Sequence, residues 1–176
     1  MPAAPSSSAP SPPPFPYSRA RKRLHWLSAL IIVWATFSGF GVGLLAPEQP
    51  LRVWVETLNP QLTSVFIPFF LLRLWLYLRE GQRAGARHNL AAAVVHGLLY
   101  GLIFSVLLSG VLMMTHPVTM LWVMDFPQLI HSTAVLAQIH AVHHVLCAAL
   151  ALLVALHLGA VAMHALRGQS VLYRMR

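Results

Sequence analysis

Two histidines in the last apolar stretch of the chain have a spacing that suits metal-centred cofactors. His143 and His157 lie fourteen residues apart. On an α-helix this separation is about four turns, so both side chains lie on nearly one face, with a rise of roughly 21 Å between them. Imidazole is a common ligand of metal ions and of haem iron. The spacing therefore predicts two cofactors, each at a different depth along one helix.

A third histidine, His25, begins the first apolar stretch directly after a basic cluster, and His157 lies ten residues before Arg167. Basic residues beside apolar stretches mark the cytoplasmic side, so both histidines belong to that half of a membrane. An iron that holds two neutral imidazoles suits electron transfer rather than oxygen binding. We expect His25 and His157 to form such a pair; the alternative for each is a hydrogen bond at a helix end or between helices.

The partner of His143 is open from the sequence, because no histidine lies between His25 and His88. The candidates on the outer side are His116, His131, His140 and His144. A ligand on the same helix as His143 cannot easily reach the opposite face of a cofactor, which favours His116 and His131.

Two further residues belong to the predicted inner site. His96, early in the third apolar stretch, is expected to line the inner cofactor pocket or a quinone pocket, with a plain helix–helix contact as the alternative. Arg73, about two turns from the end of the second stretch, is expected to pair with an acidic cofactor group such as a haem propionate. Its alternative is to extend its side chain to the membrane surface.

The elements that must position these residues follow from composition. The chain has 176 residues, of which 57% are hydrophobic and 9% charged, with a mean hydropathy of +0.67. Such a composition is typical of membrane proteins. Each of four apolar stretches reaches the roughly 20 residues that cross a bilayer. The sequence thus predicts an all-α integral membrane four-helix bundle, with helices at about 25–45, 59–78, 91–114 and 135–164.

The net charge of +8 is better explained by topology than by nucleic-acid binding. Basic residues precede the first stretch, fill the loop after the second and follow the fourth, whereas the other two connections contain only Arg52 among basic residues. By the positive-inside rule, both termini and the middle loop are cytoplasmic. A nucleic-acid partner is therefore not expected.

The remaining segments complete the predicted organisation. Residues 1–18 are rich in proline and serine and are expected to be a disordered tail before a single domain at 19–176. Leu51 to Leu58 is expected to lie along the outer interface, and Val118 to Ile130 to fold at the outer surface. The only cysteine, Cys147, excludes an internal disulfide and a CxxCH site for covalent haem.

The motifs in their order resemble the bacterial cytochrome b561 family of four-helix, di-haem b-type cytochromes, which is related to the cytochrome b subunits of nickel-iron hydrogenases and formate dehydrogenases. The resemblance covers about residues 17–176. Its carriers are Tyr17-Ser18-Arg19 before Leu24-His25-Trp26, Arg73-Leu74, His96 with Tyr100, the spacing of His143 and His157, and the closing Leu172-Tyr173-Arg174-Met175.

The resemblance implies a ligand set. It assigns His25 and His157 to the cytoplasmic-side haem, and His143 to the periplasmic-side haem together with a histidine near the start of the second helix. By spacing from Arg73, that last position is Asn59 in this chain, and asparagine is not a normal axial ligand. The outer haem is then absent, five-coordinate, or ligated by a relocated residue such as His116, so one or two b haems are expected.

The resemblance also implies a function: a multi-pass cytochrome of the bacterial inner membrane that exchanges single electrons with the quinone pool, with superoxide oxidation as one activity known in the family. A first alternative is a membrane-anchor cytochrome b subunit of a larger dehydrogenase. The second is a histidine-lined metal transporter, since imidazole also suits zinc, copper and nickel. Expected partners are lipid, quinone and a redox protein, with a homodimer left open.

Overall fold

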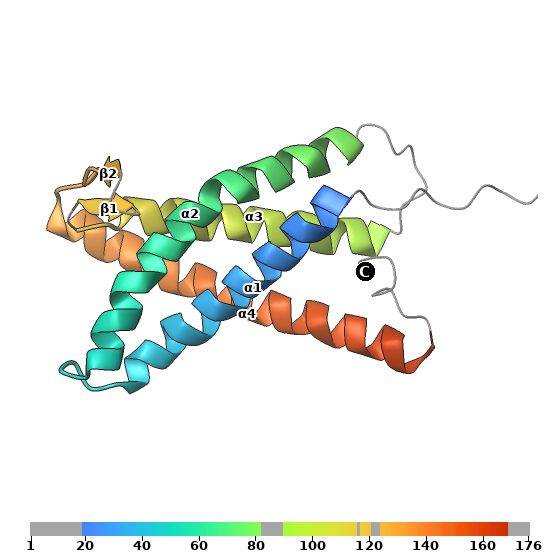
Figure 1. Ribbon diagram of the computed structural model, residues 1–176, viewed down its shortest axis with the longest axis horizontal. Coiled ribbons are helices and arrows are strands. Elements are labelled where there is room, and N and C mark those ends of the chain that lie inside the picture. Colours follow the sequence, from blue (N-terminus) through green and yellow to red (C-terminus); the bar gives the residue numbers. More distant parts are fainter. Residues whose placement is uncertain (1–18, 82–89, 116, 121–123, 169–176) are drawn as a thin grey trace, which may run out of the picture.

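Four long helices dominate the computed structural model, which describes residues 19–81, 90–115, 117–120 and 124–168 (Figure 1). All four are long and apolar enough to cross a membrane, which confirms the predicted all-α membrane bundle. The predicted tail at 1–18, His88 and His116 lie outside the described residues. The elements in order are α1 (Arg19–Gly41), the short 3₁₀ helix η1 (Val42–Leu44), α2 (Pro50–Gly81), α3 (Leu90–Leu112), β1 (Val118–Met120), β2 (Met124–Phe126) and α4 (Thr133–Leu166).

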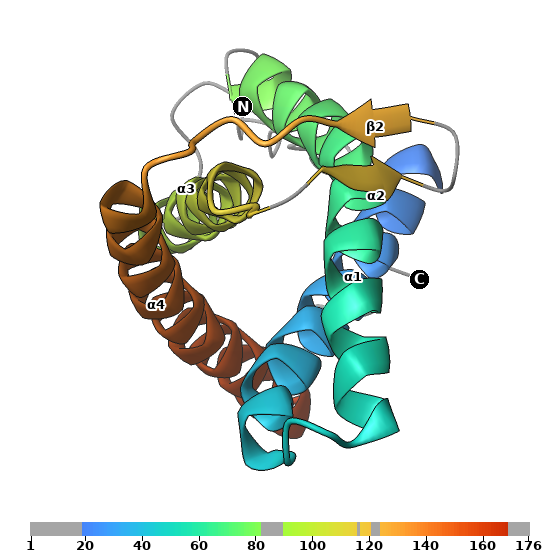
Figure 2. The ribbon, with the colours of Figure 1, turned by 90° about the vertical axis from the view of Figure 1, so that its left-hand side faces the viewer.

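The helices form two antiparallel hairpins. Helix α1 packs along α2, and α3 packs along α4, whereas contacts between the hairpins are sparser. Figure 2 shows α3 and α4 on one side of the molecule and α1 and α2 on the other. Residues on different hairpins therefore face each other across the bundle, as ligands from α1 and α4 to a shared cofactor would have to do.

Helix α2 differs from the prediction at its beginning. The second helix was expected from about residue 59, whereas Leu51 to Leu58 form the first two turns of a continuous helix that includes Pro60 and Pro68. Trp54 lies edge-on against Trp34 of α1, with ring centroids 6.1 Å apart. Figure 1 shows that α2 bends along its length, as expected for a helix with internal prolines.

The apolar core lies midway along the bundle and takes residues from all four helices. Phe66 and Phe70 of α2 are each 1% exposed and pack with Ile31, Ile103 and Leu150 of the other three helices. Leu150 lies seven residues from both His143 and His157. A packed apolar layer thus separates the two histidine levels, so they are distinct sites.

The segment between α3 and α4 folds into a small antiparallel hairpin of β1 and β2, in which Thr119 pairs with Asp125. The Thr119 hydroxyl also donates to an Asp125 carboxylate oxygen at 2.6 Å. Gln61 of α2 donates from its side chain to the Thr119 carbonyl at 2.6 Å, which ties this connection to the other helix hairpin. We call this end of the bundle the hairpin end and the end that carries Arg19 the basic end.

Candidate functional site

Four helices each place one nitrogen-bearing side chain at a similar level near the basic end. His25 lies six residues after the start of α1, Arg73 eight before the end of α2, His96 six after the start of α3 and His157 nine before the end of α4. We call these four residues the basic-end cluster. The sequence predicted all four as parts of the inner site, and the fold brings them to one level.

Contacts within the basic-end cluster connect the helices. A guanidinium nitrogen of Arg73, Nη2, lies 2.9 Å from Nδ1 of His25. The rings of His96 and His157 meet edge-on with centroids 5.8 Å apart. Both of these imidazoles are also near enough to His25 to act on it electrostatically. The hydrogen bond joins α1 to α2 and the ring contact joins α3 to α4, so each contact lies within one helix hairpin.

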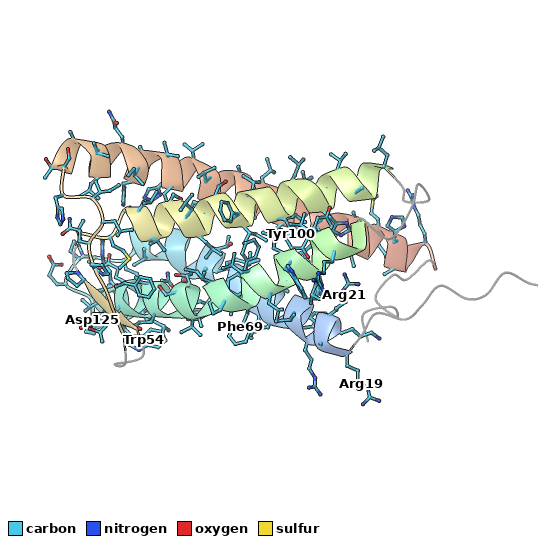
Figure 3. All side chains as sticks on the ribbon, turned by 90° about the horizontal axis from the view of Figure 1, so that it is seen from above. Arg19, Arg21, Trp54, Phe69, Tyr100 and Asp125 are labelled. Carbon is cyan, nitrogen blue, oxygen red and sulfur yellow. The ribbon has the colours of Figure 1, made fainter. Side chains whose placement is uncertain are left out.

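Two tyrosines extend the basic-end cluster. The Arg73 guanidinium carbon, Cζ, lies 5.3 Å from the centroid of the Tyr100 ring, a cation–π distance. Tyr77, one turn after Arg73 on α2, stacks on Tyr100 with centroids 4.4 Å apart. Figure 3 shows Tyr100 on the same half of the molecule as Arg19 and Arg21. The rings hold Arg73 at the level of His25, and Tyr77 is a residue that sequence reasoning missed although it lies four positions after Arg73.

Among the side chains that the structure describes, the charge around the basic-end cluster is one-sided. The carboxylates whose side chains the structure describes, Glu48, Glu56 and Asp125, all lie toward the hairpin end. Arg73 is half-buried, and its contacts are with an imidazole and a phenol ring rather than with a carboxylate. A buried guanidinium is stabilised by an anionic partner, so the cluster is complementary to a ligand that carries carboxylate groups.

His143 lies in a different environment, where both of its ring nitrogens have protein partners. The Ser109 hydroxyl donates to the Ser105 carbonyl at 2.7 Å and lies 2.9 Å from Nδ1 of His143. Its oxygen therefore accepts the Nδ1 proton. Nε2 then accepts from the Cys147 thiol, whose Sγ lies 3.4 Å away. With this assignment of protons, each ring nitrogen of His143 has one hydrogen-bond partner.

Asn59 is satisfied by α1. Its side-chain oxygen, Oδ1, accepts from the Trp34 indole at 3.1 Å and from the Ser38 hydroxyl at 2.9 Å. Those contacts join α1 to α2, whereas the contacts of His143 join α4 to α3. The structure thus places the two residues in separate hydrogen-bond groups.

A comparison with protein-family models identifies the family of the chain. The model described as prokaryotic cytochrome b561 matches residues 16–176, nearly the whole chain. The chain belongs to the prokaryotic cytochrome b561 family. It is therefore a multi-pass membrane protein of a family that transfers electrons through haem b. A search of curated proteins finds no match.

The basic-end cluster has the chemistry that a cytochrome b561 needs for haem b. Imidazoles from His25 on α1 and His157 on α4 are suitable axial ligands on two separate helices at one level. Arg73 supplies a cation for an acidic substituent. Among the described residues, no three His, Cys, Asp or Glu side chains are grouped around a point where a metal ion could be held.

The remaining predicted residues are less well matched to a haem. His131 is exposed before α4, and His140 and His144 pack against each other on the surface of α4. Sequence reasoning missed the roles of Ser109 and Cys147 beside His143. The spacing of four residues between His143 and Cys147 was a usable signal, because such residues are neighbours on a helix face, but the approach of Ser109 depends on how α3 packs on α4.

Proposed function

We propose that this cytochrome b561 carries one haem b at the basic-end cluster, with His25 and His157 as axial ligands. In this proposal it passes single electrons between the quinone pool and a second redox partner in the bacterial inner membrane, with both termini cytoplasmic. The observation that carries the proposal is the convergence of His25, Arg73 and His157 at one level from three helices.

The ligand chemistry defines a role for Arg73. If Nε2 of His25 held the haem iron, the ring proton would lie on Nδ1, the nitrogen that faces Arg73. A guanidinium only donates hydrogen bonds, so Arg73 must then take another acceptor. A haem propionate is the natural one, because the described carboxylates of the chain lie toward the other end. Arg73 thereby orients the cofactor and offsets its negative charge.

The site is covered on one side and open on another. Haem b, when bound, supplies a one-electron carrier whose change of charge the protein must tolerate. Phe70 is 1% exposed, and its ring centroid lies 6.2 Å from that of Tyr100, so it closes the site toward the bundle centre.

His96 is exposed beside His157, where it is able to donate a hydrogen bond to a quinone carbonyl. We therefore place quinone exchange at His96.

Contacts in the half of the bundle near the hairpin end support one haem per chain rather than two. Asn59, at the position where the family resemblance expects a histidine, uses its oxygen to hold α1. His143 has both ring nitrogens engaged by Ser109 and Cys147. A second haem would require His143 to leave these partners and would still lack its usual second ligand. His116, the alternative ligand, lies outside the described residues.

A haem assay tests the ligand proposal. A pyridine haemochrome measurement on the purified protein is expected to give one b haem per chain. Substituting His25→Ala or His157→Ala is expected to abolish haem binding, whereas His143→Ala, the matched control on α4, is expected to retain it. Two haems per chain in the wild type, or haem retained without His25, would contradict the proposal.

A second assay separates the electron partners. In liposomes that contain only this protein and quinol, we expect the haem to become reduced, since the proposed exchange needs no other subunit. His96→Gln is expected to slow this reduction without loss of haem. Reduction only after a soluble dehydrogenase is added would favour the membrane-anchor alternative. Adding a superoxide source to the same liposomes, with oxidised quinone, tests superoxide oxidation, which rests on the family resemblance alone.

A further inference from the structure

A histidine pair on the surface of α4 lies apart from the proposed haem site. His140 and His144 are four residues apart, both exposed, and their ring centroids are 4.6 Å apart. Within the described part of the chain, neither ring makes a hydrogen bond, so their nitrogens are available to a ligand. The proposed ligands of the haem, His25 and His157, lie beyond the apolar core on the far side of Leu150.

The pair lies in the part of α4 that is near the hairpin end of the bundle. His143 contacts Ser109 of α3 and lies 3.5 Å from the position of a Cβ on Gly110. Helix α3 ends at Leu112, only two residues beyond Gly110. His140 lies almost one turn further toward the hairpin end than His143, and therefore lies level with the last turn of α3. Figure 1 shows this end of α4 beside the β1–β2 hairpin.

The chemistry of the pair suits a transition metal. Two histidines at i and i+4 on one helix face are the spacing that zinc-binding helices use, because both imidazoles then reach the same ion. Neutral imidazole prefers copper, zinc and nickel to magnesium or calcium, and copper binds most tightly in that series. We infer that His140 and His144 together bind one divalent transition-metal ion, Cu²⁺ in preference to Zn²⁺, at the hairpin end of the bundle.

His143 does not belong to this site. Its ring centroid is 6.5 Å from that of His144, and its nitrogens are engaged by Ser109 and Cys147. Among the described residues, no third His, Cys, Asp or Glu side chain completes a metal-binding group. Water or a small anion therefore fills the remaining coordination positions, and the ion stays exchangeable.

Copper titration of the full-length protein tests this inference. The protein is purified in detergent without a polyhistidine tag and treated with a chelator, and Cu²⁺ alone is then added while its electron paramagnetic resonance spectrum is followed. We expect one site per chain with coupling to two imidazole nitrogens. Either His140→Gln or His144→Gln is expected to weaken Cu²⁺ binding by at least roughly tenfold, since the second ligand of a chelate acts at high effective concentration.

The matched control is His164→Gln. His164 is also exposed on α4, but Ala160 and Gly168 lie four residues to either side, so it has no histidine partner at that spacing. Its loss is expected to leave Cu²⁺ affinity unchanged. Equal affinity in all three variants, or weakening in only one of the two pair variants, would overturn the chelate.

Haem content separates this inference from the proposed function. Both pair variants are expected to keep the wild-type haem content, whatever that content is. If His140→Gln or His144→Gln instead removes haem, the residue is a haem ligand and the metal-site inference fails. The copper site does not depend on which residues hold the haem elsewhere, so a failure of the His25 and His157 ligand proposal leaves it unaffected.

Discussion

His143 and His157 lie on one face of one helix, yet their neighbours give them different chemistry. His157 meets His96 and lies near His25 and Arg73, which come from three other helices. His143 has Ser109 as the partner of Nδ1 and Cys147 as the partner of Nε2. A buried imidazole without partners is costly, so both arrangements are stable, but only the first leaves a ring that can turn toward a cofactor.

Replacing Arg73 tests its proposed role beside the haem. Arg73→Gln removes a positive charge from the proposed haem site. Removal of this charge favours the more positive ferric state, so the midpoint potential is expected to fall by on the order of 50 mV. Arg73→Lys keeps the charge and is expected to shift the potential less. The control is Arg79→Gln, since Arg79 stacks on Trp75 with its guanidinium carbon 3.9 Å from the ring centroid. Potentiometric titration measures all three variants; an unchanged or raised potential in Arg73→Gln would refute this role.

Asn59→His tests why a second haem is not expected. The substitution supplies the ligand that the family resemblance places here, and removes the oxygen that accepts from Trp34 and Ser38. We expect the haem content to rise from one toward two per chain, because His143 then gains an opposing imidazole. Asn59→Gln keeps an amide and is expected to stay at one haem. Pyridine haemochrome assays give both numbers, and no rise in Asn59→His would contradict this explanation.

At the scale of helices, hydropathy predicted the existence and order of all four spans, because each must cross the same apolar thickness. It placed the start of the second helix at about residue 59 rather than at Pro50, because charged Arg52 and Glu56 lowered the local hydropathy. Nε of Arg52 and Oε1 of Glu56 lie 2.9 Å apart on successive turns and form an ion pair. This pair supports a continuous helix through a segment whose hydropathy is typical of the membrane interface.

Within the candidate site, the sequence could identify the ionisable residues, because it costs free energy to place such side chains in an apolar membrane span. His25, Arg73, His96 and His157 are ionisable side chains in apolar spans, and such residues are retained for function. The hydrogen bonds of Asn59 and Ser109 were not predictable, since small polar side chains in a helix carry no pattern that identifies the neighbouring helix. The β1–β2 hairpin was likewise predicted only as a surface segment.

Adjacent phenylalanines on α2 test the packed core. Phe70 is 1% exposed, whereas Phe69 is 42% exposed and is labelled in Figure 3. Phe70→Ala is expected to reduce the free energy of unfolding in detergent by about 1–2 kcal/mol, less than in a water-soluble protein, because lipid is as apolar as the core and only packing is lost. Phe69→Ala is expected to change it by less than about 0.5 kcal/mol. Titration with a denaturing detergent compares the variants; equal losses would argue against the core.

At the scale of the whole molecule, charge is divided between the two ends. The basic end has Arg19, Arg23 and Arg79 among its exposed residues. Among the described residues of the hairpin end, Arg52 near the start of α2 is the only Lys or Arg, and its ion pair with Glu56 offsets its charge. The proposed haem site therefore lies in the half of the bundle that has the greater positive charge, where the positive-inside rule places the cytoplasm.

Single cysteines introduced at the two ends decide this orientation. In a Cys147→Ala background, Gln49→Cys lies in the turn between η1 and α2, and Ala20→Cys lies in the first turn of α1. In spheroplasts, a membrane-impermeant maleimide is expected to label Gln49→Cys directly and Ala20→Cys only after detergent is added, because basic segments are retained in the cytoplasm. The background protein alone should stay unlabelled. The reverse pattern would place the proposed haem, and the electron exchange at His96, on the periplasmic side and the His140–His144 pair in the cytoplasm.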